Sequence, residues 1–233
     1  RISVNCYVIR ANGKIAVIDT GSGDTMGPTL GMLTKFLTEI DIDLPQVDTV
    51  LLTHMHPDHS NGLSDVNGKR LFPNAEIVVS EKDIDYWHDD SAMAKANENQ
   101  RVRYFEGARF QIAPYMDRLK PAMGEVFPNV RAVDLSGHTP GHTGYMIESQ
   151  NDSLLVWGDI CHVPDIQVRR PEVTMVFDAD PEAAINARRR TFDMVSSDKV
   201  LVAGMHLHFP GFSHVIANRD GYRMVPESWA FTT

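Results

Sequence analysis

The amino-acid sequence predicts an α/β protein with a single domain over residues 1–233. Short β-rich runs alternate along the chain with segments whose apolar residues recur at helical spacing. A chain of 233 residues is longer than most single domains, but layered α/β proteins commonly reach this size around one core. Several predicted strands end in loops that carry His or Asp. Because loops at strand ends position functional side chains, the function is expected there.

The first elements predict a hairpin followed by a strand, loop and helix. Residues 3–10 and 14–18 are β-rich and flank Asn12-Gly13, the dipeptide best suited to a two-residue type I′ turn. Residues 29–40 then show helical spacing. Strands are expected over residues 49–53 and 77–79.

The segment of about residues 80–120 predicts a helical insertion, with Ser80 and Asp83 resembling a capping box. Strands resume over residues 130–134, 143–148 and 154–157. Asp180-Pro181 predicts the start of a helix that runs to about residue 195, with Asp180 as N-cap. A strand over residues 199–203 and a hairpin over residues 215–225, turning at Asp220-Gly221, complete the pattern.

Composition and charge limit the classes of partner. The chain has 31 acidic residues against 22 Lys and Arg, so its net charge of −9 would repel phosphate backbones. No apolar run approaches the roughly 18 residues of a membrane-spanning helix. The only clustered positive charge, Arg188, Arg189 and Arg190, is expected on the solvated face late in a helix. We therefore expect neither nucleic acid nor a membrane as partner.

The two cysteines leave the cellular compartment open. Cys6 and Cys161 match no CxxC metal pattern, so they are either buried small apolar side chains or one disulfide. The chain begins at Arg1 without Met, so we expect that an upstream segment, a signal peptide included, can be missing. Cytoplasmic, periplasmic and secreted locations all remain open.

The loop of residues 54–59 carries the strongest functional signal. It places His54, His56, Asp58 and His59 within six residues, directly after an apolar strand. Imidazole nitrogens and carboxylate oxygens are ligands that divalent zinc accepts. Because a loop leaving a strand can turn successive side chains toward one point, this segment predicts metal binding.

These four residues resemble the HxHxDH signature of the metallo-β-lactamase superfamily. The resemblance extends along the chain in the family's order to Asp19-Thr20-Gly21, to the segment 137–143 that contains His142, to Gly158-Asp159 and to Gly204-Met205-His206. It implies an αββα four-layer sandwich with two divalent metal ions, zinc before iron or manganese. It also implies a metal set consisting of His54, His56, Asp58, His59, His142, Asp159 and His206.

In the family pattern, His54, His56 and His142 would hold the first metal, Asp58, His59 and His206 the second, and Asp159 would bridge them. Two cations roughly 3.5–4 Å apart can share a hydroxide that acts as nucleophile at neutral pH. Asp58 could pass a proton to the leaving group, which makes it the expected catalytic residue.

Other histidines compete with two of these assignments. His138 lies four residues before His142 and is expected in a turn or beside the ligands, and His206 is favoured over His208. His162 and His214 are expected at the surface or behind the ligands, and His88 in solvent. Asp19 is expected to accept backbone hydrogen bonds and orient the ligand loop.

The most similar members by motif are the methyl parathion hydrolase-like phosphotriesterases and the N-acyl homoserine lactonases. That resemblance implies an uncharged ester, lactone or phosphotriester as small-molecule substrate, and a homodimer is compatible with it. Trp87 would either line an apolar substrate pocket or pack the helical insertion. An iron-dependent oxidoreductase resembling the persulfide dioxygenases and a β-lactam hydrolase remain as alternatives.

Overall fold

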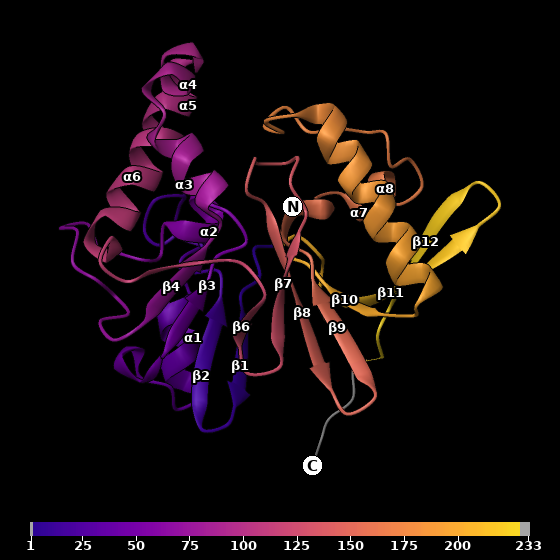
Figure 1. Ribbon diagram of the computed structural model, residues 1–233, viewed down its shortest axis with the longest axis horizontal. Coiled ribbons are helices and arrows are strands. Elements are labelled where there is room, and N and C mark those ends of the chain that lie inside the picture. Colours follow the sequence, from indigo (N-terminus) through magenta and orange to yellow (C-terminus); the bar gives the residue numbers. More distant parts are fainter. Residues whose placement is uncertain (1, 229–233) are drawn as a thin grey trace. The chain divides into compact units, whose positions relative to one another are not determined.

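The computed structural model describes residues 2–228, and the chain divides into two compact units. The N-terminal unit is Cys6–Pro128, drawn in indigo to magenta in Figure 1. The C-terminal unit combines Arg1–Asn5 with Asn129–Thr233. Each unit has its own sheet and its own hydrophobic core. The single domain over residues 1–233 stays a prediction.

The N-terminal unit contains a five-stranded sheet in the order β1-β2-β3-β4-β5. The β1–β2 pair is antiparallel, and the pairs β2–β3, β3–β4 and β4–β5 are parallel. Its elements are β1 (Tyr7–Ala11), β2 (Lys14–Ile18), α1 (Leu33–Glu39), η1 (Leu44–Gln46), β3 (Thr49–Leu51), α2 (Pro57–Ser60), β4 (Glu76–Val79), α3 (Glu81–His88), α4 (Asp90–Lys95), α5 (Glu98–Gln100), η2 (Arg101–Glu106), α6 (Gly107–Ile112), η3 (Ala113–Tyr115), β5 (Leu119–Pro121) and β6 (Glu125–Phe127).

The predicted N-terminal hairpin is present, with a shorter first strand than expected. Asn12 and Gly13 have φ of 52° and 75°, as a type I′ turn requires, and Ala11 pairs with Lys14. The first strand starts at Tyr7 because the preceding residues bond elsewhere. Asn5 donates its backbone N–H to the Met205 carbonyl at 2.8 Å within the C-terminal unit.

The core of the N-terminal unit joins its helices to its sheet. Leu37 of α1, Trp87 of α3 and Ile112 of α6 belong to the same buried cluster as Val17 and Val50 of the sheet. The first helix is shorter than the predicted 29–40 because Gly31, with a φ of 74°, interrupts a helical backbone. Between residues 80 and 120 the chain is largely helical, as the pattern predicted.

The C-terminal unit arranges its strands in the order β12-β11-β10-β9-β8-β7. Its elements are β7 (Val130–Asp134), β8 (Thr143–Ser149), β9 (Asp152–Val156), η4 (Gly158–Ile160), α7 (Pro164–Gln167), α8 (Pro181–Ser197), β10 (Leu201–Ala203), β11 (Phe212–Asn218) and β12 (Gly221–Pro226). The β9–β10 pair is parallel, and β8 is antiparallel to both β7 and β9. The carboxyl ends of β7, β9 and β10 therefore meet at one edge of this sheet.

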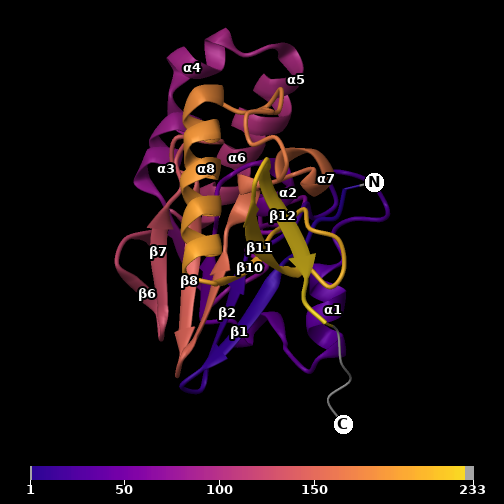
Figure 2. The same cartoon turned by 90° about the vertical axis from the view of Figure 1, so that its right-hand side faces the viewer.

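Helix α8 begins as predicted and packs on this sheet. The Asp180 carboxylate accepts the Ala183 N–H at 3.0 Å, and Pro181 occupies the first turn. Phe192 of α8 belongs to the same core cluster as Leu155 of β9. Figure 2 shows α8 lying along the strands of this unit.

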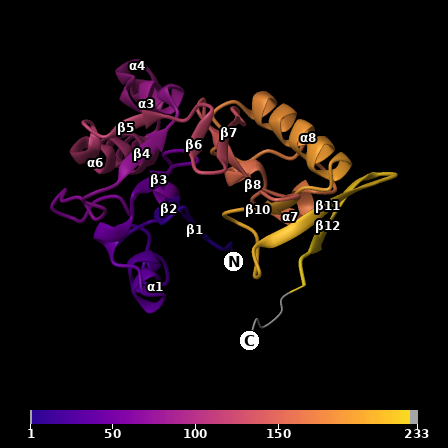
Figure 3. The same cartoon turned by 60° about the horizontal axis from the view of Figure 1, so that its bottom comes forward.

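The hairpin at the end of the described chain turns one residue earlier than expected. Asn218 pairs with Gly221, so Arg219 and Asp220 form the two-residue turn and Gly221 already belongs to β12. Figure 3 shows this β11–β12 hairpin in yellow. Gly221 has a φ of 129°, and a Cβ there would lie 2.8 Å from the Arg169 carbonyl oxygen, which explains glycine at this position.

Arg188 corrects the expectation of a solvated arginine cluster. Its side chain is buried and donates hydrogen bonds to the carbonyls of Ile160, Pro171 and Val173 at 2.7–3.0 Å. Of the three arginines, Arg189 and Arg190 are the exposed ones on α8. The sequence pattern missed this because the guanidinium satisfies three loop carbonyls rather than the end of its own helix.

Two further expectations are settled by the structure. Cys6 and Cys161 are both free, and burial raises the pKa of each thiol, to about 12 for Cys161. Among residues 2–228, no helix is both long enough and apolar enough to span a membrane.

Candidate metal centre

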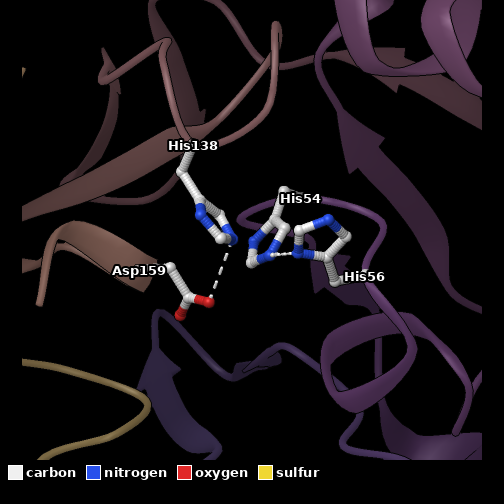
Figure 4. Close-up of side chains that lie close together, drawn as sticks. All are labelled: His54, His56, His138 and Asp159. Atoms are coloured by element: carbon white, nitrogen blue, oxygen red, sulfur yellow. Dashed lines mark hydrogen bonds and ion pairs between the residues drawn. The ribbon is translucent and has the colours of Figure 1, made fainter. Parts of the chain in front are cut away.

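The ligand loop of the N-terminal unit leaves β3 and continues into the short helix α2. His54, His56 and His59 are all buried. The Nε2 atom of His54 lies 3.0 Å from Nδ1 of His56, and Figure 4 shows the two rings turned toward each other. Zinc–nitrogen bonds of 2.0–2.1 Å in a tetrahedral site separate two ligand nitrogens by about 3.3 Å. The two imidazoles thus present nitrogens at a spacing that suits one metal ion.

Asp19 at the end of β2 fixes this loop from behind. Its carboxylate accepts the backbone N–H of Thr53 and the Thr53 hydroxyl, each at 2.7 Å. It also lies 2.7 Å from Nδ1 of His59. With Nδ1 of His59 donating to this carboxylate, Nε2 of the neutral ring keeps its lone pair. The predicted role of Asp19 in accepting a backbone hydrogen bond and orienting the loop is confirmed.

Asp83 is a second buried carboxylate that holds the loop. It accepts the backbone N–H of Met55 at 2.9 Å and the indole N–H of Trp87 at 3.2 Å. The predicted capping box is wrong, because Ser80 is the N-cap of α3 without a side-chain cap bond. No local pattern signals the Asp83–Met55 bond, because it joins residues 28 positions apart.

Asp58 and Tyr104 lie beside these imidazoles. The Oδ1 atom of Asp58 is 3.6 Å from Nε2 of His59, and the Asp58 side chain keeps 21% of its surface exposed. Tyr104 packs edge-on against His56 at 5.0 Å between ring centroids. Burial, and then the charge of Asp58, raise the pKa of Tyr104. Asp58 is therefore the carboxylate of this loop that solvent can reach.

Trp87 packs inside the N-terminal unit. It is 3% exposed, belongs to the hydrophobic core cluster and contacts the His56 ring edge-on at 5.4 Å. This burial favours the packing interpretation. Trp87 therefore supports the position of the His56 ring by packing against it.

In the C-terminal unit, three imidazoles surround one carboxylate oxygen. The Oδ2 atom of Asp159 lies 3.2 Å from Nε2 of His138, 3.0 Å from Nε2 of His162 and 3.2 Å from Nε2 of His206. All four residues are buried. They follow β7, β9 and β10, whose carboxyl ends share one sheet edge.

The structure brings His138, rather than the expected His142, to the Asp159 carboxylate. His142 uses Nδ1 toward the Leu135 carbonyl at 3.1 Å, and its Nε2 accepts the backbone N–H of Asp159 at 2.9 Å. Both ring nitrogens of His142 therefore serve the backbone. His138 instead directs Nε2 at the Asp159 carboxylate, as Figure 4 shows.

Two carboxylates flank the His138 ring. Its Nδ1 atom lies 2.7 Å from Oδ1 of Asp178, opposite its contact with Asp159. Burial lowers the pKa of His138, but the hydrogen bonds and charges of Asp159 and Asp178 outweigh burial and raise the pKa to about 9. Such a strongly anionic setting also attracts a divalent cation in place of the proton.

His206 and His208 lie in different surroundings. His206 is 4% exposed, and its Nδ1 lies 2.7 Å from the Ser3 carbonyl oxygen, which directs Nε2 to Asp159. His208 is exposed and lies 3.4 Å from the Ser3 hydroxyl. His88 is exposed on α3, as expected.

His162 lies at the Asp159 carboxylate, a position that its place in the sequence does not by itself predict. It is 3% exposed, and its ring stacks on His206 at 5.0 Å between centroids. Burial lowers the pKa of His162 and outweighs the opposite effect of Asp159. Its position three residues after Asp159, in the turn that follows η4, is the signal that could have placed it at the carboxylate.

The donor atoms fit divalent metal ions. In the C-terminal unit alone, Asp159, His162 and His206 offer ligand atoms within 4.8 Å of one another. Imidazole nitrogen and carboxylate oxygen suit zinc, and also iron and manganese. The donor atoms of each unit are therefore of the kinds that divalent metal ions accept.

The model of the metallo-beta-lactamase superfamily matches residues 1–206. The chain belongs to this superfamily. The predicted fold class is confirmed, with two sheets and helices in a mixed α/β fold.

Two solved structures resemble the chain over 99% of its length. The hydrolase AbOPH of the beta lactamase superfamily is 31% identical, with 81% of its own chain covered and a TM-score of 0.91. AidC, described as a dizinc quorum-quenching lactonase in complex with its product, is 24% identical, with 81% coverage and a TM-score of 0.91. The first supports the predicted metal-dependent hydrolase, and the second shows the superfamily fold.

A curated relative is much longer than this chain. The lactamase-like protein ptaB of Pestalotiopsis fici is 29% identical over 147 residues, which are 63% of this chain and 36% of that protein. The chain thus spans only about a third of the length of that superfamily relative.

Proposed function

We propose that the protein is a dinuclear metal-dependent hydrolase of lactones and uncharged carboxylic esters, with phosphotriester cleavage as a side activity. The observation that carries the proposal is the orientation of the histidines. The Nδ1 atoms of His59, His138 and His206 face Asp19, Asp178 and the Ser3 carbonyl, which leaves each Nε2 for a metal.

The grouping of ligands in this proposal follows the order of the superfamily's motifs. One metal would be held by His54, His56 and His138, and the other by Asp58, His59 and His206, with Asp159 shared. His138 replaces His142 in this set because both nitrogens of His142 bond to the backbone. AidC, described as dizinc, supports two zinc ions.

When bound, two adjacent divalent cations lower the pKa of a shared water and polarise the substrate carbonyl. Asp58 supplies the proton transfer. As the water oxygen bonds to the acyl carbon, an Asp58 carboxylate oxygen takes the water proton. It then delivers that proton to the alkoxide oxygen as the carbon–oxygen bond of the ester or lactone breaks. Its partial exposure lets it reach a substrate.

The substrate class follows from charge and surroundings. A net charge of −9 disfavours anionic substrates, and the aromatic ring of Tyr104 borders His56 with apolar surface. AidC is described as a lactonase, and its bound product is an acyl homoserine. These observations support an uncharged lactone or ester with an apolar portion.

The test is a set of initial rates on zinc-reconstituted protein, with its metal content measured on the same sample. The substrates are an N-acyl homoserine lactone, an aryl carboxylic ester and an aryl phosphotriester. We expect two metal ions per chain, with lactone or carboxylic ester turned over faster than phosphotriester. Chelation should abolish turnover, and zinc should restore it.

A chain that binds two metals but hydrolyses neither the lactone nor the aryl ester would contradict the substrate class. One iron per chain with oxygen uptake on a persulfide would instead favour the oxidoreductase alternative. A β-lactam as the fastest substrate would favour the antibiotic-hydrolase alternative.

A further inference from the structure

His162 is a third imidazole at Asp159 in the C-terminal unit, beyond the two that the proposed ligand set uses. Its Nε2 atom lies 3.0 Å from Oδ2 of Asp159, the shortest of the three imidazole contacts to that oxygen. The residue is held in place by Gln167, whose side-chain oxygen accepts the His162 backbone N–H at 2.7 Å. The backbone and the ring of His162 are thus both held by hydrogen-bonding contacts.

The two neighbouring imidazoles show how a ligand histidine is prepared. Nδ1 of His138 faces a carboxylate oxygen of Asp178, and Nδ1 of His206 faces the carbonyl oxygen of Ser3. Both partners can only accept hydrogen bonds, so each Nδ1 carries the proton. In the neutral ring Nε2 then presents its lone pair, which is the form that binds a metal.

His162 lacks such an acceptor. Its Nδ1 atom is buried and has no hydrogen-bond partner among the described residues, so no acceptor holds the proton there. The acceptor in reach is the Asp159 carboxylate, on the side of Nε2. The neutral ring therefore carries its proton on Nε2, which donates rather than coordinates.

We propose that His162 is a positioning residue that donates its Nε2–H to the Asp159 carboxylate and fixes the orientation of the shared metal ligand. The inference rests on the proposed metal site. It assigns the three imidazoles to two classes: His138 and His206 offer lone pairs, whereas His162 offers a proton. Stacking of His162 on His206 adds a second constraint on a ligand ring.

This role predicts a graded effect on metal binding. Groups that orient metal ligands typically change metal affinity by 10- to 100-fold when removed, while the number of ligands stays the same. Replacing His162 should therefore weaken metal binding without removing a binding position. A true ligand would behave differently, because its loss changes the coordination itself.

The experiment compares His162→Gln, His162→Phe and the control His214→Phe. Glutamine can place an N–H where Nε2 stands, and phenylalanine cannot donate. His214 is a partly exposed histidine of the same unit, 3.4 Å from Glu227. Zinc affinity is measured by chelator competition, and the coordination of the cobalt-substituted proteins by visible absorption spectra.

We expect His162→Phe to bind zinc roughly 10- to 100-fold more weakly with an unchanged number of metal ions. His162→Gln should recover most of that affinity and keep the wild-type cobalt spectrum, and His214→Phe should match the wild type. Equal loss of one metal ion in both His162 variants would overturn the proposal by making His162 a ligand. An unchanged zinc affinity in His162→Phe would also overturn the proposal, because it would show that His162 does not support metal binding.

The protonation of the ring gives a readout that does not require metal. Nitrogen-15 NMR of histidine-labelled protein, with and without zinc, should show the His162 proton on Nε2. A proton on Nδ1 of His162 would contradict the inference even if the wild type binds two metal ions. A wild type that binds no metal would instead sink the proposed function, whatever the His162 ring shows.

Discussion

The two units build their clusters of candidate metal ligands in opposite ways. In the N-terminal unit, one short loop supplies His54, His56, Asp58 and His59, and the buried carboxylates of Asp19 and Asp83 hold it. In the C-terminal unit, the groups around Asp159 come from the separate loops after β7, β9 and β10. Candidate ligands that are neighbours in one loop can be recognised in the sequence. Candidate ligands from separate loops cannot, because their roles depend on which ring nitrogen is bonded to a partner that is distant in sequence.

The largest expected effect is the loss of the shared carboxylate. Asp159→Ala should lower kcat/KM for the best ester or lactone by about 10³-fold or more, since metal activation contributes several kcal/mol of transition-state stabilisation. Zinc content should fall below two per chain. Wild-type kinetics with two zinc ions still bound would show that the C-terminal half is dispensable.

The next test addresses the choice between two histidines of one loop. His138→Gln should lose a metal ion and lower kcat/KM by about 10²-fold or more, as a lost ligand weakens metal activation. His142→Gln should keep both metal ions and instead destabilise the fold by about 1–3 kcal/mol, because buried backbone groups lose their partners. Metal content and urea unfolding of both variants decide which histidine binds the metal. Loss of a metal ion in His142→Gln but not in His138→Gln would make His142 the ligand.

A third comparison sets the supporting carboxylates of the two units against each other. Asp178→Asn and Asp19→Asn should each weaken zinc binding by roughly 10- to 100-fold. Asp19→Asn should also lower thermal stability more, because Asp19 accepts two hydrogen bonds from Thr53, from its backbone N–H and its hydroxyl, whereas Asp178 accepts one backbone N–H, that of Met175. Equal melting temperatures for the two variants would argue against this difference between the units.

The smallest effect concerns stability away from the metal ligands. Arg188→Met should cost about 2–3 kcal/mol, since several carbonyls lose a buried charged donor. The exposed neighbour provides the control, and Arg189→Met should change the free energy of unfolding by less than about 0.5 kcal/mol. Denaturant unfolding measures both, and equal values would return Arg188 to the solvated face.

Local pattern by itself determined much of this protein. Asn12-Gly13 specifies the first turn because both residues accept positive φ. Asp180-Pro181 specifies the start of α8 because the Asp180 side chain accepts the N–H of Ala183, three residues further on. The loop of residues 54–59 predicts metal binding because its candidate ligands are neighbours in sequence. The order of the motifs was sufficient to predict the superfamily, which the family match confirms.

Only the tertiary structure decided the roles of the other histidines. His138, His142 and His162 are similar in the sequence, and what separates them is the partner of the second ring nitrogen. For His138 that partner is 40 residues away, and for His206 it is 203 residues away. The same holds for Arg188, which looks like a surface cation until the carbonyls of residues 160, 171 and 173 fold around it. The sequence determines which polar groups are present. The fold determines which acceptor lies next to each of them, and that acceptor decides which ring nitrogen carries the proton and where a buried cation lies.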